Sequence, residues 1–347
     1  MRLSRFLLSR SALFLAPLVL PLACAGNPGS SSPLPGLSVI RPPSEVSALA
    51  LQGDEVWAGG KEGLYLIDRR SARLVRRMEP PRPITYVRAL LADPAGVLWV
   101  GYGEGLASFD GESWRFFGRA DGLPDERVNC LLRDHLGRLW AGTWGGAAVL
   151  EGGRWSVLTR ADGLLEDMVN VMAEDDEGGL WFGSYVAPRG GLSYDRGTNW
   201  SRFTTASGLP HNAVNAIVQD GAGGLWVATG FYDRGGLCRI ERSGEGWSIT
   251  RVMTEREGLP GPKARSLFQD RAGVLWLGSE YDGMAILRDG RWGYLRMEDG
   301  LSAPETKAVA QDADGTLWLG TSDGVTVIRG EALPGVVERL IARGRGS

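Results

Sequence analysis

The chain has 347 residues, with 51 glycines, 13 tryptophans, two histidines and a formal net charge of −3. This charge balance provides no basic field for nucleic acid, which excludes nucleic-acid partners. The two histidines restrict metal binding and acid–base catalysis from the start.

The first 23 residues have the features of an export signal. Three arginines precede an apolar stretch over residues 11–22, which is too short to span a bilayer. Cys24 at the end of this stretch predicts a bacterial lipoprotein with the lipid on Cys24, although Ala23-Cys24-Ala25 also fits ordinary cleavage and secretion. Residues 24–36 predict a flexible Gly/Ser/Pro tether. We therefore expect an exported protein of the periplasm or outer membrane that touches the membrane only through a lipid.

An internal repeat dominates the rest of the chain. The pattern Asp-x-x-Gly-x-Leu-Trp occurs six times, and a shortened copy around Trp57 precedes them. Successive signature tryptophans are 42, 41, 41, 45, 50 and 42 residues apart. A fixed period near this length indicates a repeat architecture.

Each repeat reads as four short strands, A to D. A short apolar run precedes the Asp-x-x-Gly turn, Leu-Trp follows it, and two more short runs complete the unit. Four antiparallel strands per repeat predict an all-β fold, a seven-bladed β-propeller over residues 37–330. Twelve of the 13 tryptophans fall at strand-B or strand-D positions, which assigns them to packing between blades.

The seventh repeat lacks a strand D of its own. We expect the N-terminal run 37–41 to supply this outer strand and close the ring, with 336–341 as the alternative. Residues 331–347 are otherwise expected to be a C-terminal tail. Cys130 and Cys238 fall on non-adjacent blades, so we expect two free, buried thiols.

The joints between blades contain Gly-Leu, often followed by Pro. Together with the following strand and turn, as in residues 208–227, they resemble the two-component regulator propeller repeat over about residues 45–330. The resemblance implies the periplasmic sensor part of hybrid histidine kinases, many of which are associated with sensing polysaccharide breakdown products. This sequence shows neither the transmembrane helix nor the kinase segment of those sensors, so only the fold and a ligand- or partner-binding role carry over.

The residue five before each turn Asp is polar although it lies in an apolar strand. These residues should surround the mouth of the central channel on the face shared by the D–A and B–C connections. They are Arg88, Asn129, Asn170, Asn215, Arg265 and Lys307, with Ser47 as their counterpart in the first blade. One interpretation is a water-filled channel whose polar side chains satisfy backbone groups. The other is a ring with three cations and no anions that binds an anionic or polyhydroxy ligand.

The B–C loops of the same face carry aromatic and charged residues, which is typical of recognition surfaces. The candidates are Trp144, Tyr185, Arg189, Tyr232, Arg234 and Tyr281.

We expect no catalytic site, metal or cofactor. The Gly-x-Ser-x-Gly match at 320–324 links two strands rather than a strand and a helix, which predicts a turn. His135 and His211 should lie on opposite faces. The predicted function is an oligosaccharide- or anion-sensing module of the cell envelope; the alternatives are a scaffold for an envelope protein and, third, a propeller-type lyase or hydrolase.

Overall fold

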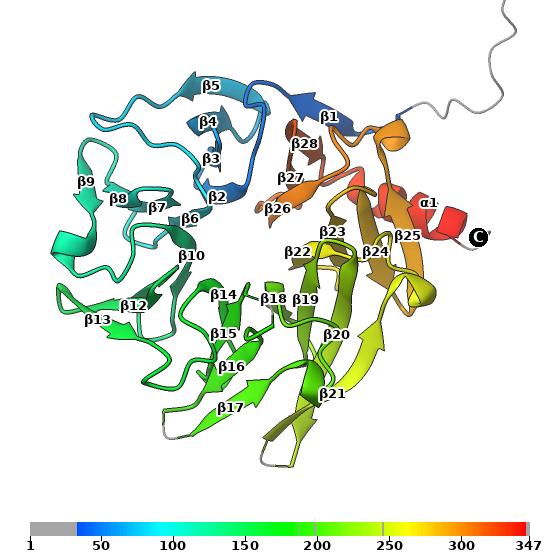
Figure 1. Cartoon of the computed structure of the whole chain (residues 1–347). Coiled ribbons are helices and arrows are strands. Elements are labelled where there is room, and N and C mark those ends of the chain that lie inside the picture. Colours follow the sequence, from blue (N-terminus) through cyan, green and yellow to red (C-terminus); the bar gives the residue numbers. More distant parts are fainter. Residues whose placement is uncertain (1–32, 187, 198, 245, 345–347) are drawn as a thin grey trace, which may run out of the picture. The chain divides into compact units, whose positions relative to one another are not determined.

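The computed structural model describes residues 33–186, 188–197, 199–244 and 246–344. The predicted export signal, Cys24 and most of the tether lie outside these residues. Seven four-stranded antiparallel sheets follow one another in a ring around a central axis (Figure 1), so the predicted seven-bladed β-propeller is confirmed.

The innermost strand of each blade lines the channel. These A strands are β2 (Ala48–Gln52), β6 (Ala89–Ala92), β10 (Val128–Arg133), β14 (Val169–Glu174), β18 (Val214–Gln219), β22 (Ala264–Gln269) and β26 (Thr306–Gln311). The B strands carry the signature tryptophans: β3 (Glu55–Gly60), β7 (Leu98–Tyr102), β11 (Leu139–Thr143), β15 (Leu180–Ser184), β19 (Leu225–Phe231), β23 (Leu275–Ser279) and β27 (Leu317–Thr321).

The outer half of each blade consists of strands C and D. The C strands are β4 (Gly63–Asp68), β8 (Gly105–Phe109), β12 (Gly146–Glu151), β16 (Leu192–Asp195), β20 (Arg234–Ser243), β24 (Met284–Arg288) and β28 (Gly324–Ile328). The D strands are β5 (Arg73–Arg77), β9 (Trp114–Phe117), β13 (Arg154–Leu158), β17 (Trp200–Phe203), β21 (Gly246–Met253), β25 (Arg291–Leu295) and, for the seventh blade, β1 (Leu37–Ile40).

The turn Asp organises the hairpin between strands A and B. In all six repeats its Oδ1 accepts a hydrogen bond from the backbone N–H four residues later, at 2.8 to 3.0 Å. The turn Gly has a φ of 78° to 85°, which a residue with a Cβ adopts at a cost. In five repeats Oδ2 also accepts from the indole Nε1 of the signature tryptophan, as in Asp270 and Trp276 at 2.9 Å. The spacing of six residues therefore fixes the turn and the tryptophan together.

The core consists of seven apolar clusters, one at each interface between neighbouring blades. Each contains one signature tryptophan; Trp181, Trp276 and Trp318 are fully buried. Trp276, for example, packs against Leu317 and Leu319 of the next blade. The predicted role of the tryptophans in packing between blades is confirmed.

The N-terminal strand closes the ring. β1 pairs antiparallel with β28, with Leu37 opposite Ile328 and Ile40 opposite Val325. The prediction for residues 37–41 is confirmed over Leu37–Ile40, and the alternative at 336–341 is wrong. Those residues belong instead to a helix, α1 (Leu333–Arg343).

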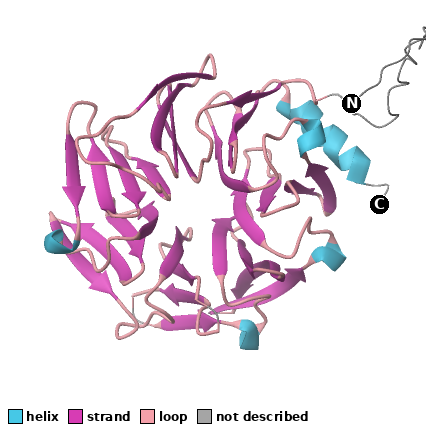
Figure 2. Ribbon diagram, turned by 45° about the horizontal axis from the view of Figure 1, so that its top comes forward, coloured by secondary structure: helices cyan, strands magenta, loops and turns pink. Residues whose placement is uncertain are grey.

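The helix α1 replaces most of the expected tail. Figure 2 shows it at the outer edge of the ring, and it packs on β24 and β25. Five apolar side chains at helical spacing form its buried face: Leu333, Val336, Val337, Leu340 and Ile341. Gly293 on β25 permits the contact, because a Cβ there would lie 2.6 Å from the backbone of Leu340. Among the described residues, no helix has the length and apolar content that a membrane crossing requires.

Short 3₁₀ turns connect successive blades. They are η1 (Arg119–Asp121), η2 (Thr205–Ser207), η3 (Glu255–Glu257) and η4 (Met297–Asp299), and each ends at a glycine with a φ of 104° to 111°. The leucine that follows each of these glycines is buried, for example Leu209 with 3% of its surface exposed. The Gly-Leu joint therefore ends the turn and anchors it in the core.

Candidate functional site

A β-bulge places a polar side chain at the start of five inner strands. The pairing of strands A and B skips one residue there, and the skipped residues are Asn129, Asn170, Asn215, Arg265 and Lys307. A bulge adds an unpaired residue and changes the direction of its side chain. The polar positions identified in the sequence are thus local breaks in the strand pairing, which is why an apolar strand tolerates them.

The three asparagines link neighbouring blades. The Nδ2 atoms of Asn129, Asn170 and Asn215 donate to backbone carbonyls of the next inner strand, those of Val169, Val214 and Ala264, at 2.9, 2.8 and 2.8 Å. The sequence analysis offered this structural role, in which polar side chains of the ring satisfy backbone groups, as its first interpretation. These hydrogen bonds use only the amide N–H groups and leave the amide oxygen of each asparagine for other contacts.

The acceptor side of these amides differs from blade to blade. Asn129 Oδ1 accepts from Arg88 Nη1 at 3.0 Å and from Trp144 Nε1 at 3.1 Å. Asn215 Oδ1 is buried and has no hydrogen-bond partner among the described residues. A buried acceptor without a partner costs stability, and this atom is closed off from the cavity, so a ligand would instead meet the exposed atoms of the neighbouring ring residues.

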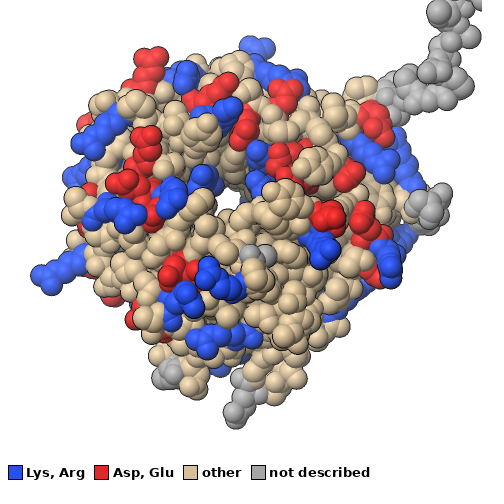
Figure 3. Space-filling view, in the orientation of Figure 1, with Lys and Arg blue, Asp and Glu red and all other residues tan. Residues whose placement is uncertain are grey.

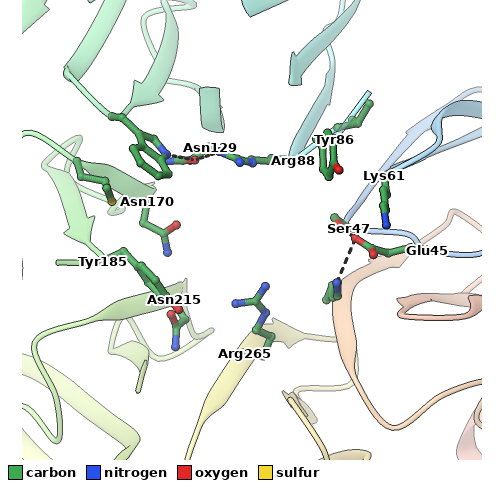
Figure 4. Close-up of a pocket in the computed structure, with 14 residues that line it drawn as sticks. Glu45, Ser47, Lys61, Tyr86, Arg88, Asn129, Asn170, Tyr185, Asn215 and Arg265 are labelled. Carbon is green, nitrogen blue, oxygen red and sulfur yellow. Dashed lines mark hydrogen bonds and ion pairs between the residues drawn. The ribbon is translucent and has the colours of Figure 1, made fainter. Parts of the chain in front are cut away.

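These side chains surround a cavity of about 400 Å³ at the mouth of the channel (Figure 4). All seven ring residues and two of the loop candidates line it: Ser47, Arg88, Asn129, Asn170, Asn215, Arg265, Lys307, Trp144 and Tyr185. The space-filling view shows the channel opening, with basic side chains at its rim (Figure 3). The structure thus brings nine residues from different blades to one cavity.

Sequence analysis missed five further lining residues: Glu45, Lys61, Tyr86, Val87 and Met168. Glu45, Tyr86 and Met168 each stand two positions before a ring residue. Side chains two apart in an extended chain lie on the same side, so this spacing could have identified them.

The predicted ring of three cations without anions needs correction. Lys307 Nζ lies 3.2 Å from Glu45 Oε1 and 3.3 Å from Glu305 Oε2, and Arg265 Nε lies 3.3 Å from Glu305 Oε1. Both glutamates come from the loops that enter the inner strands. With Lys61 and Arg88 included, four cations face two carboxylates, so the mouth keeps an excess of two positive charges.

Arg88 differs from the other two cations of the ring. Among the described residues no carboxylate lies within ion-pair distance of it; its Nη1 donates to Asn129, and its guanidinium carbon lies 5.9 Å from the centre of the Trp144 ring. Burial, and then the charge of Arg127, lower the pKa of Arg88. A partly desolvated cation without a counterion attracts an anionic group.

The remaining loop candidates lie elsewhere. Tyr232 and Tyr281 line a second cavity of about 320 Å³ between the B–C hairpins of the fifth and sixth blades. Arg189 lies 3.5 Å from Glu166, and Arg234 is exposed. Neither arginine lines either cavity, so a role for Arg189 and Arg234 in ligand binding stays a prediction.

The structure gives the histidines separate surroundings. His135 Nδ1 lies 2.5 Å from Glu174 Oε1, and His211 Nδ1 accepts a hydrogen bond from the Ala213 N–H at 3.0 Å. Burial, and then Arg234, lower the pKa of His211. Within the described ranges, no group of three or more His, Cys, Asp or Glu side chains could hold a metal ion.

The two cysteines among the described residues, Cys130 and Cys238, are free thiols. Cys238 is buried, whereas Cys130 is only partly buried, which corrects part of the expectation. Burial raises the pKa of each thiol to about 12, so neither is a reactive thiolate near neutral pH.

Comparison with known protein families now identifies the repeat. The family model described as "Two component regulator propeller" matches residues 122–145, 163–186, 208–231, 258–281 and 300–323. The chain carries two-component regulator propeller repeats. Each match begins at the Gly-Leu joint and ends in the B–C loop or, in the fifth blade, at the last residue of strand B. The first two blades lack this Gly-Leu joint. The family model therefore matches only from the third blade onward.

Solved structures share this propeller fold. The extracellular domain of BT3049 from B. thetaiotaomicron, described as a hybrid two-component system, has a TM-score of 0.74 at 19% identity, covering 87% of this chain and 42% of that one. PorZ, a surface component of the type-IX secretion system of Porphyromonas gingivalis, has a TM-score of 0.64 at 16% identity, covering 82% and 46%. The chain therefore spans less than half the length of these two proteins.

Propeller enzymes share the fold as well. Virginiamycin B lyase from Staphylococcus aureus, in a catalytically inactive form with quinupristin, has a TM-score of 0.65 at 13% identity, covering 84% of this chain and 98% of that one. Identities this low show the fold alone. No match was found among curated proteins.

Proposed function

We propose that this chain is an exported, non-enzymatic binding module that senses an anionic, polyhydroxylated ligand at the cell envelope, an acidic oligosaccharide being the favoured class. The cavity at the channel mouth carries the proposal. It combines an excess of two positive charges and an unpaired arginine with three aromatic side chains, Tyr86, Trp144 and Tyr185. Few, well-placed polar groups on a concave wall are typical of ligand sites.

The contacts of the cavity support an acidic ligand. Arg88 is planar and retains free N–H groups, so it can hold a carboxylate with two parallel hydrogen bonds. Arg127 lies 4.0 Å over the Trp144 ring, and the part of this ring that stays exposed can pack with Tyr185 against the apolar face of a sugar ring.

The relatives support the sensing role. BT3049 is described as a hybrid two-component system, and the solved part as its extracellular domain. We infer from this and from the first 23 residues that the chain is exported, with a lipid on Cys24. Labelling the expressed protein with a radioactive fatty acid tests the lipid: the wild type should be labelled and Cys24→Ser should not. A wild type without label would contradict the anchor.

A thermal-shift screen with acidic and neutral oligosaccharides tests the binding site. We expect an acidic member to raise the melting temperature of the wild type, because a ligand that binds only the folded state stabilises it. The shift should disappear in Arg88→Ala. Arg73→Ala, which changes an exposed arginine on an outer strand, is the matched control and should keep the shift.

A protein-binding scaffold is the second candidate function. Tyr232 and Tyr281 are 73% and 70% exposed on the same face, and exposed tyrosines are common anchors in protein interfaces. Recovery of a defined envelope protein by wild type but not by Tyr232→Ala, without any response to oligosaccharides, would favour the scaffold over the ligand sensor.

A lyase or hydrolase is the third candidate. It would have to use His211 alone, since His135 lies in an A–B turn on the other face of the ring. Turnover of an oligosaccharide that His211→Ala abolishes would establish it.

A further inference from the structure

A row of aromatic side chains connects the two cavities of the channel-mouth face. Tyr185 lines the first cavity, and its ring centre lies 5.5 Å from that of Phe231. The ring centres of Phe231 and Tyr232 are 4.2 Å apart, and Tyr232 lines the second cavity together with Tyr281. Both contacts are edge to face, with ring planes at 77° and 70°, so three successive rings in contact link the two cavities across the fourth and fifth blades.

The fold does not require the two outer tyrosines. Tyr232 is 73% exposed and Tyr281 70% exposed, so neither contributes much to the core. Tyr232 is the first of the two turn residues between β19 and β20 and has a φ of 53°, where glycine is the ordinary residue. A bulky residue at such a position has no folding advantage that would explain it.

The two cavities carry opposite charge. The mouth of the channel has an excess of two positive charges. The second cavity is lined by Asp233, Glu280 and Asp282 against one cation, Lys263, whose Nζ lies 2.6 Å from Glu280 Oε2. Carboxylates accept hydrogen bonds from hydroxyl groups but repel anions. An occupant that reaches both cavities must therefore be acidic at one end and uncharged at the other.

We infer that the two cavities are the ends of one elongated site for an oligosaccharide with a single acidic sugar at one end, an inference that rests on the proposed function. The acidic sugar occupies the channel mouth, with its carboxylate on Arg88. Neutral sugar units follow the row of Tyr185, Phe231 and Tyr232. The last unit lies between Tyr232 and Tyr281, with its hydroxyl groups donating to Asp233 and Asp282.

Calorimetric titration of the exported chain with a matched series of sugars tests this. The series contains glucuronic acid, xylotriose, and an aldotetraouronic acid in which one glucuronate is joined to three neutral xylose units, together with a galacturonate-ended counterpart. We expect an acid-ended tetrasaccharide to bind about tenfold more tightly than its free acid. The neutral trisaccharide should bind more weakly than the tetrasaccharide by a similar factor.

Substitutions separate the two ends of the site. Tyr232→Ala with Tyr281→Ala should weaken the tetrasaccharide about tenfold and leave the free acid within about twofold. Arg88→Ala should weaken both. Phenylalanine at both tyrosine positions should retain tight binding, because the ring faces remain. Tyr232→Gly removes the ring while easing the backbone, so a loss of affinity there, at an undiminished melting temperature, cannot be attributed to misfolding.

Three other results would each contradict a specific part of this proposal. Unchanged tetrasaccharide binding in the double alanine variant would overturn the elongated site and leave the channel-mouth site intact. Tighter binding of the neutral trisaccharide than of the acid-ended chain would overturn the acidic end. An absence of binding by every acidic member would overturn the proposed function itself, and the elongated site with it.

Discussion

At the scale of single residues, the turn Asp links backbone geometry to core packing. Its two oxygens bind the hairpin backbone and the indole N–H of the signature tryptophan, which lies in the interface between blades. In two blades the hydrogen bond between the turn Asp and the indole is replaced by another side-chain contact. In the first blade Gln52 Oε1 accepts from Trp57 Nε1 at 3.2 Å, and in the fifth blade Asp220 Oδ2 binds Arg239 Nε at 3.0 Å.

Asp270→Ala should be strongly destabilising. It leaves the N–H groups of Ala272 and Val274 and the buried indole of Trp276 without their acceptor. Unpaired buried donors cost about 1–3 kcal/mol each, so the two buried donors, those of Val274 and Trp276, give an expected loss of about 2–6 kcal/mol in the free energy of unfolding, measured by urea denaturation. Asp270→Asn, which keeps the oxygen that binds the backbone, should lose less. Equal losses in the two variants would contradict this account.

Tyr232→Gly should stabilise the protein, in contrast to most substitutions. A bulky residue at a φ of 53° costs on the order of 1 kcal/mol, and glycine relieves this cost. Tyr281→Gly is the matched control, because Tyr281 has equal exposure but no positive φ. Calorimetric scans should show a higher melting temperature for the first variant and an unchanged or lower one for the second. The reverse order would exclude strain at Tyr232.

At the scale of elements, strand β1 converts an open series of blades into a ring. Its four residue pairs with β28 join the beginning of the chain to its end. Without β1, the edge of β28 would be open to other chains. The helix α1 does not close the ring; it covers apolar side chains of the sixth blade from outside.

Removal of residues 1–43 should therefore destabilise the propeller and cause self-association. A protein that lacks only residues 1–32 is the control and should keep the melting temperature of the full chain. Scanning calorimetry and light scattering measure both effects. A monomeric 1–43 deletion with an unchanged melting temperature would show that β1 is dispensable for closure.

At the scale of the whole molecule, hydrogen-bonded carboxylates determine the acid limit of the fold. Arg127 holds the pKa of Asp125 at about 2, below the ordinary value of 3.8. Hydrogen bonds and arginines lower the pKa of further carboxylates, including Asp54, Asp68, Asp134 and Asp162. A carboxyl group whose pKa is lower in the folded state than in the unfolded chain stabilises the fold above its unfolded pKa.

The contribution of these carboxylates to the free energy of unfolding should therefore be constant above pH about 5. It should decrease as the pH falls from about 4 to about 2. Denaturation measured at a series of pH values checks this. Asp125→Asn should be less stable at neutral pH and should show a shallower loss of stability in acid. A stability that increases toward pH 2 would reverse the sign and contradict the assignment.

Much of the fold could be predicted from the sequence because its determinants are local. The Asp-x-x-Gly-x-Leu-Trp spacing contains the turn, the hydrogen bond to the indole and the apolar strand within seven residues. Repetition at a fixed period then implied the ring. For residues 331–347 the sequence predicted a tail, or a closing strand at 336–341, where the structure has the helix α1. The helical spacing of five apolar residues would have indicated the helix: Leu333, Val336, Val337, Leu340 and Ile341.

The candidate site could be predicted only in part. The sequence by itself determined which positions are polar in apolar strands, because each repeat supplies the same offset from its turn Asp. Only the tertiary structure decided which of these residues keep an unpaired group. Glu45 and Glu305 neutralise Lys307 and Arg265, whereas Arg88 meets an asparagine and a tryptophan, and these contacts join residues that lie up to 262 positions apart in the chain. The strength of an electrostatic interaction depends on distance in space and on burial, and ring closure sets both.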